Sequence, residues 1–103
     1  MYIFNAEICT SELFSAQCDV NEVLVMTSAV YGRMALGRCV EEDVGFLGCH
    51  NDARDVMDVE CSGRRECEVL ISRRLLRKDT QESCNSALEG YARLSYTCTP
   101  GER

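Results

Sequence analysis

Eight cysteines are the residues of this chain whose type and spacing most constrain its chemistry. They lie at positions 9, 18, 39, 49, 61, 67, 84 and 98 of 103 residues. An even number of cysteines spread over a short chain is typical of a disulfide framework, which forms in an oxidising compartment. We therefore expect four disulfides in a protein that is secreted or resides in a secretory lumen. Sequence alone leaves on the order of a hundred pairings.

Metal binding and redox chemistry fit these cysteines less well. Structural zinc sites usually place paired ligands about two to four residues apart, whereas the closest pair, Cys61 and Cys67, encloses five residues, and His50 is the only histidine. No Cys-x-x-Cys motif supplies a low-pKa attacking thiol. Calcium at residues 41–43 would need about six to eight oxygens, and three adjacent carboxylates point in different directions. We expect no metal and no cofactor.

Other function classes are disfavoured by composition. The chain offers no nucleophile, histidine and acid set for an enzyme, and its net charge of −6 disfavours binding to nucleic acid. No apolar run reaches the roughly 18 residues needed to cross a bilayer. The start, residues 1–4, lacks the basic and long apolar regions of a signal peptide, which suggests a mature form.

Hydrophobic patterning predicts the elements that must position these residues. Apolar and β-branched stretches predict strands over 13–18, 22–33, 66–71 and 91–98. A helical period follows Asn51, which we expect to be the N-cap, and Ser62-Gly63 should stop the helix. The length allows one domain, 1–99, and a polar tail, 100–103, that we expect to fray. The pattern indicates an α+β fold with one main helix.

Several short motifs lie in register with the cysteines. Tyr31-Gly32-Arg33 ends a β-rich stretch, eight residues separate the first two cysteines, a short helix ends at the fifth, and residues 94–98 read Leu-Ser-Tyr-Thr-Cys. Together these features resemble the sea urchin egg lectin family, the rhamnose-binding or galactose-binding (SUEL-type) lectin domain, over nearly the whole chain. The resemblance implies a small antiparallel β-sandwich with one helix. It also implies four disulfides, which pair Cys9–Cys39, Cys18–Cys98, Cys49–Cys84 and Cys61–Cys67.

The resemblance further implies calcium-independent binding of galactosyl or rhamnosyl glycans, on cell surfaces or glycoproteins, in a shallow pocket lined by loops. Neutral sugars are held by convergent hydrogen bonds to their hydroxyls and by planar side chains against their C–H faces. Tyr31 matches the family's sugar-contacting tyrosine, and Arg33 matches the arginine of the motif. A noncovalent homo-oligomer would add avidity, because single exposed sugar pockets bind weakly.

Four aligned positions depart from the family. The acid that follows its first cysteine is Thr10 here, with Glu12 two residues further on. The lysine of its Lys-Tyr-Leu is Gly90, its Asp-Pro-Cys becomes Glu82-Ser83-Cys84, and its loop asparagine becomes Arg73. The candidate carbohydrate contacts are therefore Thr10, Tyr31, Arg33, Arg73, Glu82 and Gly90. The alternative is a disulfide-stapled extracellular adhesion or protein-interaction module that has lost sugar binding.

A basic cluster stands out in this acidic protein. Residues 73–78 hold four of the eleven basic residues. The cluster could attract a sulfated or sialylated glycan or an acidic protein surface. We favour a solvated face that is paired internally with nearby acids, because surface charge runs are common.

Overall fold

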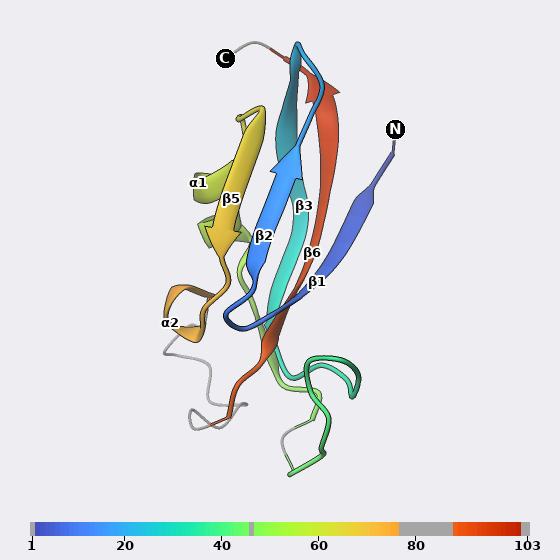
Figure 1. Cartoon of the computed structure of the whole chain (residues 1–103), viewed down its shortest axis with the longest axis vertical. Coiled ribbons are helices and arrows are strands. Elements are labelled where there is room, and N and C mark those ends of the chain that lie inside the picture. Colours follow the sequence, from blue (N-terminus) through green and yellow to red (C-terminus); the bar gives the residue numbers. More distant parts are fainter. Residues whose placement is uncertain (1, 46, 77–87, 102–103) are drawn as a thin grey trace.

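Two antiparallel sheets form the framework of the computed structural model, which describes residues 2–45, 47–76 and 88–101 (Figure 1). The larger sheet has the strand order β1-β6-β3-β4 and the smaller pairs β2 with β5. The strands of the larger sheet are β1 (Phe4–Cys9), β6 (Tyr91–Pro100), β3 (Glu22–Gly32) and β4 (His50–Asp52). The strands of the smaller sheet are β2 (Leu13–Gln17) and β5 (Glu66–Leu70). Their antiparallel pairing agrees with the expected fold.

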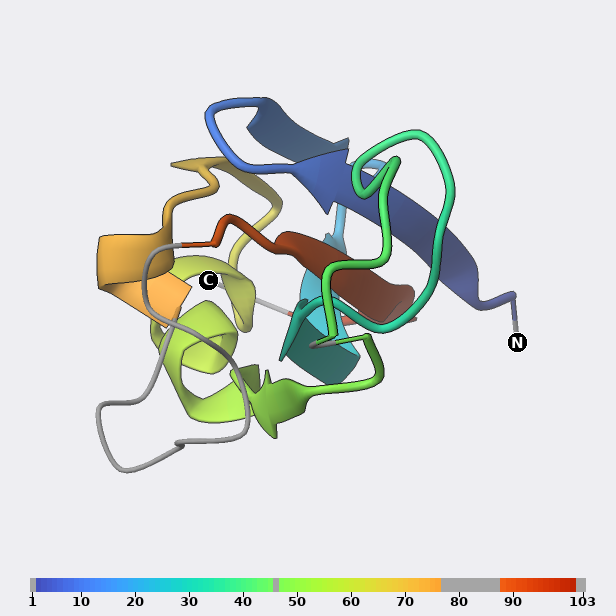
Figure 2. The ribbon, with the colours of Figure 1, turned by 90° about the horizontal axis from the view of Figure 1, so that it is seen from below.

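The hydrophobic core lies between the two sheets. Along β2, Phe14 and Ala16 are buried while their neighbours are exposed, because successive side chains of a strand point to opposite faces. The buried positions of β3 and β6 meet them from the larger sheet, with Leu24 and Leu94 fully enclosed. A helix, α1 (Arg54–Cys61), adds Met57 to the same core. Figure 2 shows α1 and the short α2 (Arg73–Leu76) on one flank, away from the 34–45 loop.

The predicted strands are observed, but two local expectations require correction. Asn51 is not the helix cap, because it lies buried in β4 and its side chain donates to the Leu76 carbonyl oxygen at 2.9 Å. The helix begins at Arg54, whose amide donates to the Asp52 carboxylate at 2.9 Å. Patterning also missed β1, and β6 runs two residues past its predicted end to Pro100. The predicted tail therefore starts inside a strand.

Three of the expected disulfides are confirmed. They join Cys9 to Cys39, Cys18 to Cys98 and Cys61 to Cys67, with Cα–Cα distances of 5.2, 5.7 and 5.2 Å. The fourth expected pairing, Cys49 with Cys84, lies outside the described residues because Cys84 does. Cys18–Cys98 links the end of β2 to β6 and so fastens the two sheets together.

Candidate functional site

Three of the expected sugar contacts meet at the end of the molecule where β1 turns into β2. The Thr10 hydroxyl lies 3.0 Å from the Tyr31 hydroxyl and donates to the Gly90 carbonyl oxygen at 2.7 Å. The Gly90 amide points at the Tyr31 hydroxyl from 3.4 Å. We call these three residues the hydroxyl ring. It joins positions that are 21 and 59 residues apart in the chain.

Each member of the hydroxyl ring is positioned by a different element. Thr10 follows the last residue of β1, and the next residue, Ser11, has a φ of 76° that turns the chain toward β2. Tyr31 stands near the end of β3 and points inward. Gly90 precedes β6 and lies against β3, since a Cβ atom there would come within 2.5 Å of the Gly32 carbonyl oxygen. Position 90 thus has no room for the lysine that the family carries.

Both hydroxyl hydrogens of the hydroxyl ring are already used in internal hydrogen bonds. A threonine hydroxyl has one hydrogen, and Thr10 gives it to the Gly90 carbonyl oxygen. Tyr31 must therefore donate its own hydrogen to Thr10, and its oxygen accepts from the Gly90 amide. Tyr31 is only 3% exposed. The ring retains acceptor lone pairs for a ligand, and no free hydroxyl donor.

Arg33 acts as an internal brace. Its Nη1 donates to the Glu89 carbonyl oxygen at 2.7 Å and its Nη2 to the Glu42 carbonyl oxygen at 3.2 Å. The residue is 8% exposed, and its Nε is buried with no hydrogen-bond partner in the described part of the chain. Its backbone also pairs with Cys49 and Gly48. Arg33 therefore fastens the long loop after β3 to the segment before β6.

Glu12 does not take the place of the family's acid at the hydroxyl ring. Its carboxylate accepts from the Cys9 amide at 2.8 Å and from Arg38 Nη1 at 2.9 and 2.8 Å. These bonds, those from Arg38 first, hold the pKa of the Glu12 carboxyl below its ordinary value of 4.5. Arg38 Nη2 also donates to the Glu7 carbonyl oxygen at 2.7 Å. The pair closes the 34–45 loop onto the edge of β1.

The remaining candidates do not join the hydroxyl ring. Arg73 begins α2 and its side chain is exposed, and it is not a member of the ring. Glu82 lies outside the described residues, as do Arg77 and Lys78 of the basic cluster. The ring thus brings together Thr10, Tyr31 and Gly90, with Arg33 fastened beside it.

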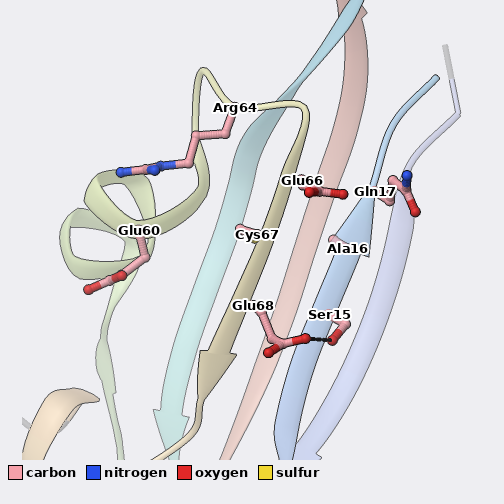
Figure 3. A pocket seen from close by; sticks show the side chains of 8 residues that line it. All are labelled: Ser15, Ala16, Gln17, Glu60, Arg64, Glu66, Cys67 and Glu68. Atoms are coloured by element: carbon pink, nitrogen blue, oxygen red, sulfur yellow. Dashed lines mark hydrogen bonds between the residues drawn. The ribbon is translucent and has the colours of Figure 1, made fainter. Parts of the chain in front are cut away.

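Sequence reasoning missed an open groove along the smaller sheet, shown in Figure 3. It has a volume of about 740 Å3 and lies between β2, β5 and the end of α1. Glu60, Glu66 and Glu68 line it with one arginine, Arg64, and Glu68 accepts a long hydrogen bond of 3.5 Å from Ser15. Among residues 2–45, 47–76 and 88–101, no group of three His, Cys, Asp or Glu side chains could hold a metal ion.

No helix in the described ranges is long and apolar enough to span a membrane. Comparison with protein-family models gave no match, and comparison with curated proteins gave none either. The resemblance to the sea urchin egg lectin family therefore remains a prediction from the residues quoted above.

Proposed function

We propose that this domain is an extracellular lectin that binds galactosyl or rhamnosyl glycans without calcium. The observation that supports this is the convergence of Thr10, Tyr31 and Gly90 at one end of the fold. These three aligned positions come from separate parts of the chain, so their meeting is not a consequence of local sequence. The confirmed disulfides agree with an extracellular location, because such bonds persist in oxidising compartments.

A sugar would approach the hydroxyl ring from its half-buried member. Thr10 is partly exposed while Tyr31 is enclosed, so Thr10 Oγ1 is the atom that a sugar hydroxyl meets first. This oxygen has an acceptor lone pair beyond its bond from Tyr31. Exposed acidic residues, Glu42 and Glu89, flank the nearby Arg33 brace and can accept further hydroxyl hydrogens. Such recognition needs no metal.

A second candidate function is a protein-interaction module that keeps the fold without sugar binding. The specific observation in its favour is that the members of the hydroxyl ring bond to one another. The Tyr31 side chain that takes part in both bonds is also only 3% exposed. A ligand that competes with existing internal hydrogen bonds gains less than one that meets free groups. The two candidates predict opposite results for sugar binding.

The experiment is a glycan array probed with the labelled, oxidised protein, with and without a calcium chelator. Rhamnosides, α- and β-galactosides and sulfated glycans should be included. Thr10→Val, which keeps the shape and removes the hydroxyl, should lose binding that Thr10→Ser retains. Chelator-resistant binding to a rhamnoside or galactoside with this dependence on Thr10 supports the lectin. If the protein binds no neutral sugar on the array, the result favours the protein-interaction module.

A further inference from the structure

A second cleft lies at the other end of β1, away from the hydroxyl ring. It has a volume of about 420 Å3, within the range of roughly 300–1,000 Å3 that is common for small-molecule sites. The Cys18–Cys98 disulfide lines it together with two aromatic and three polar residues, Tyr2, Phe4, Gln17, Asp19 and Glu22. We call it the aromatic cleft. Its lining residues come from the start of β1, the connection from β2 to β3 and the end of β6, elements that Figure 1 shows.

The aromatic cleft exists because the smaller sheet does not cover the whole larger sheet. Ala6 and Ile8 point inward from β1 and pack against the core. Phe4 and Tyr2 continue the same face of the chain, yet they are 38% and 71% exposed. Two aromatic rings are thus presented to solvent, whereas Ala6 and Ile8 on the same face are partly buried.

Ring contacts with Tyr96 and with each other hold the Phe4 and Tyr2 side chains in place. Phe4 stacks on Tyr96, with ring centroids 5.0 Å apart and an interplanar angle of 14°. Tyr96 in turn meets Phe14 of the core edge to face at 5.9 Å. Tyr2 adjoins Phe4 at 4.6 Å and 61°. Phe4 is therefore anchored, while most of the Tyr2 ring remains available to a ligand.

Three polar residues, Gln17, Asp19 and Glu22, line the cleft together with these rings, and Gln17 also lines the groove along the smaller sheet. Glu22 Oε1 accepts from the Asp19 amide at 3.2 Å, and the Glu22 amide donates to the Asp19 carbonyl oxygen at 3.1 Å. These two bonds hold the turn between β2 and β3 in one shape. Within the described hydrogen bonds, none uses the Asp19 carboxylate or the Gln17 amide group. The cleft thus offers carboxylate acceptors and an amide that both donates and accepts.

We propose that the aromatic cleft binds one neutral sugar residue, with its C–H face on Tyr2 and its hydroxyls on Asp19, Glu22 and Gln17. Aromatic faces suit the apolar side of a sugar, and carboxylate and amide groups suit its hydroxyls. A quaternary ammonium ligand is disfavoured, because Phe4 already lies against Tyr96 and several free ring faces do not converge. The inference rests on the proposed lectin function and assigns it a second contact.

The test is a titration of the 15N-labelled, oxidised full chain with methyl α-rhamnoside, methyl α-galactoside and tetramethylammonium chloride. We expect a glycoside to shift the amides of Cys18 to Glu22 and of Cys98. Tyr2→Ala should weaken this binding roughly three- to tenfold, the value of one aromatic contact, while Tyr2→Phe should keep it. Val20→Ala is the matched control, because Val20 is 67% exposed beside Asp19 and does not line the cleft.

The outcomes separate this inference from the lectin function itself. Glycoside shifts at the cleft that Tyr2→Ala weakens support the inference. Shifts confined to Thr10, Tyr31 and Gly90, unchanged by Tyr2→Ala, overturn the cleft and leave the lectin function standing. Shifts with tetramethylammonium alone overturn the assignment to sugar. No shift with either glycoside overturns the cleft, and the glycan array then decides the lectin function separately.

Discussion

The Tyr31 hydroxyl donates its hydrogen to the Thr10 hydroxyl, 3.0 Å away, because Thr10 has given its own hydrogen to a backbone carbonyl. This relationship joins β3 to the turn after β1 and uses the group that the family resemblance assigns to sugar binding. Tyr31 is thus a structural residue as well as a candidate contact. The structural role predicts an effect on stability, and the contact role predicts an effect on sugar binding.

Removing the Tyr31 hydroxyl should reduce stability as well as sugar binding. Tyr31→Phe leaves the Gly90 amide and Thr10 oxygen without their partner, which costs about 1–3 kcal/mol of unfolding free energy for a buried group. Thr10→Val should cost a similar amount. Because the two residues share one bond, the double variant should lose less than the sum. Urea unfolding of the four proteins measures this, and strictly additive losses would contradict the hydroxyl ring.

Gly90→Ala should destabilise the fold strongly. The added Cβ would lie 2.5 Å from the Gly32 carbonyl oxygen, so the start of β6 must move away from β3. We expect a loss of about 1–3 kcal/mol, typical of overpacking, and a weaker hydroxyl ring. Gly37→Ala is the control, since a Cβ added there would meet no atom of the described residues within 4 Å. Equal unfolding midpoints for the two variants would argue against the close approach.

Replacing Arg33 should loosen the long loop after β3. Arg33→Met keeps an unbranched apolar stem and removes the guanidinium bonds to the Glu89 and Glu42 carbonyl oxygens. We expect faster amide hydrogen exchange at Gly48 and Gly37, because local opening becomes easier. Arg54→Met, which removes an exposed ion pair of 3.8 Å to Asp58, should leave these amides unchanged. Protection that survives Arg33→Met would show that the other contacts of the loop, the Cys9–Cys39 disulfide and the Glu12–Arg38 pair, hold it without Arg33.

The pairing of Glu12 with Arg38 predicts a pH dependence at low pH. Folding lowers the pKa of Glu12, so its contribution to stability is present above the unfolded value, near 4.5, and is lost as pH falls through the folded value. NMR titration of the Glu12 carboxyl carbon should give a midpoint below the ordinary range. Arg38→Ala should raise that midpoint, whereas Arg54→Ala should not. An unchanged midpoint in Arg38→Ala would contradict the pairing.

The two disulfides with the most different loop lengths should contribute unequally to stability. Cys18–Cys98 closes a separation of 80 residues and Cys61–Cys67 one of 6. Loop-closure entropy assigns them about 4.5 and about 2 kcal/mol, respectively. Replacing each pair by alanines and measuring unfolding in urea should give losses in that order. The reverse order would indicate that native packing, and not chain entropy, dominates their effect.

The sequence predicted those parts of the fold that follow from a local period. Alternation placed Phe14 and Ala16 on the buried face of β2, and the structure has them there. The same alternation runs through β1, where Phe4, Ala6 and Ile8 are separated by Asn5 and Glu7, so the local signal for this strand was present and was overlooked. Patterning also misassigned Asn51, since the Leu76 carbonyl oxygen that binds its side chain is 25 residues away.

The sequence by itself determined the class of the protein: a small, acidic domain held by disulfides. Three of the pairs that the family resemblance implied are confirmed. Only the tertiary structure decided how the candidate residues are used. The protons of Thr10 and Tyr31, the crowding at Gly90 and the openness of the aromatic cleft all depend on distances between segments far apart in the chain. Such distances are set by how the sheets pack, because residue types report local preference and not the partner that finally satisfies each polar group.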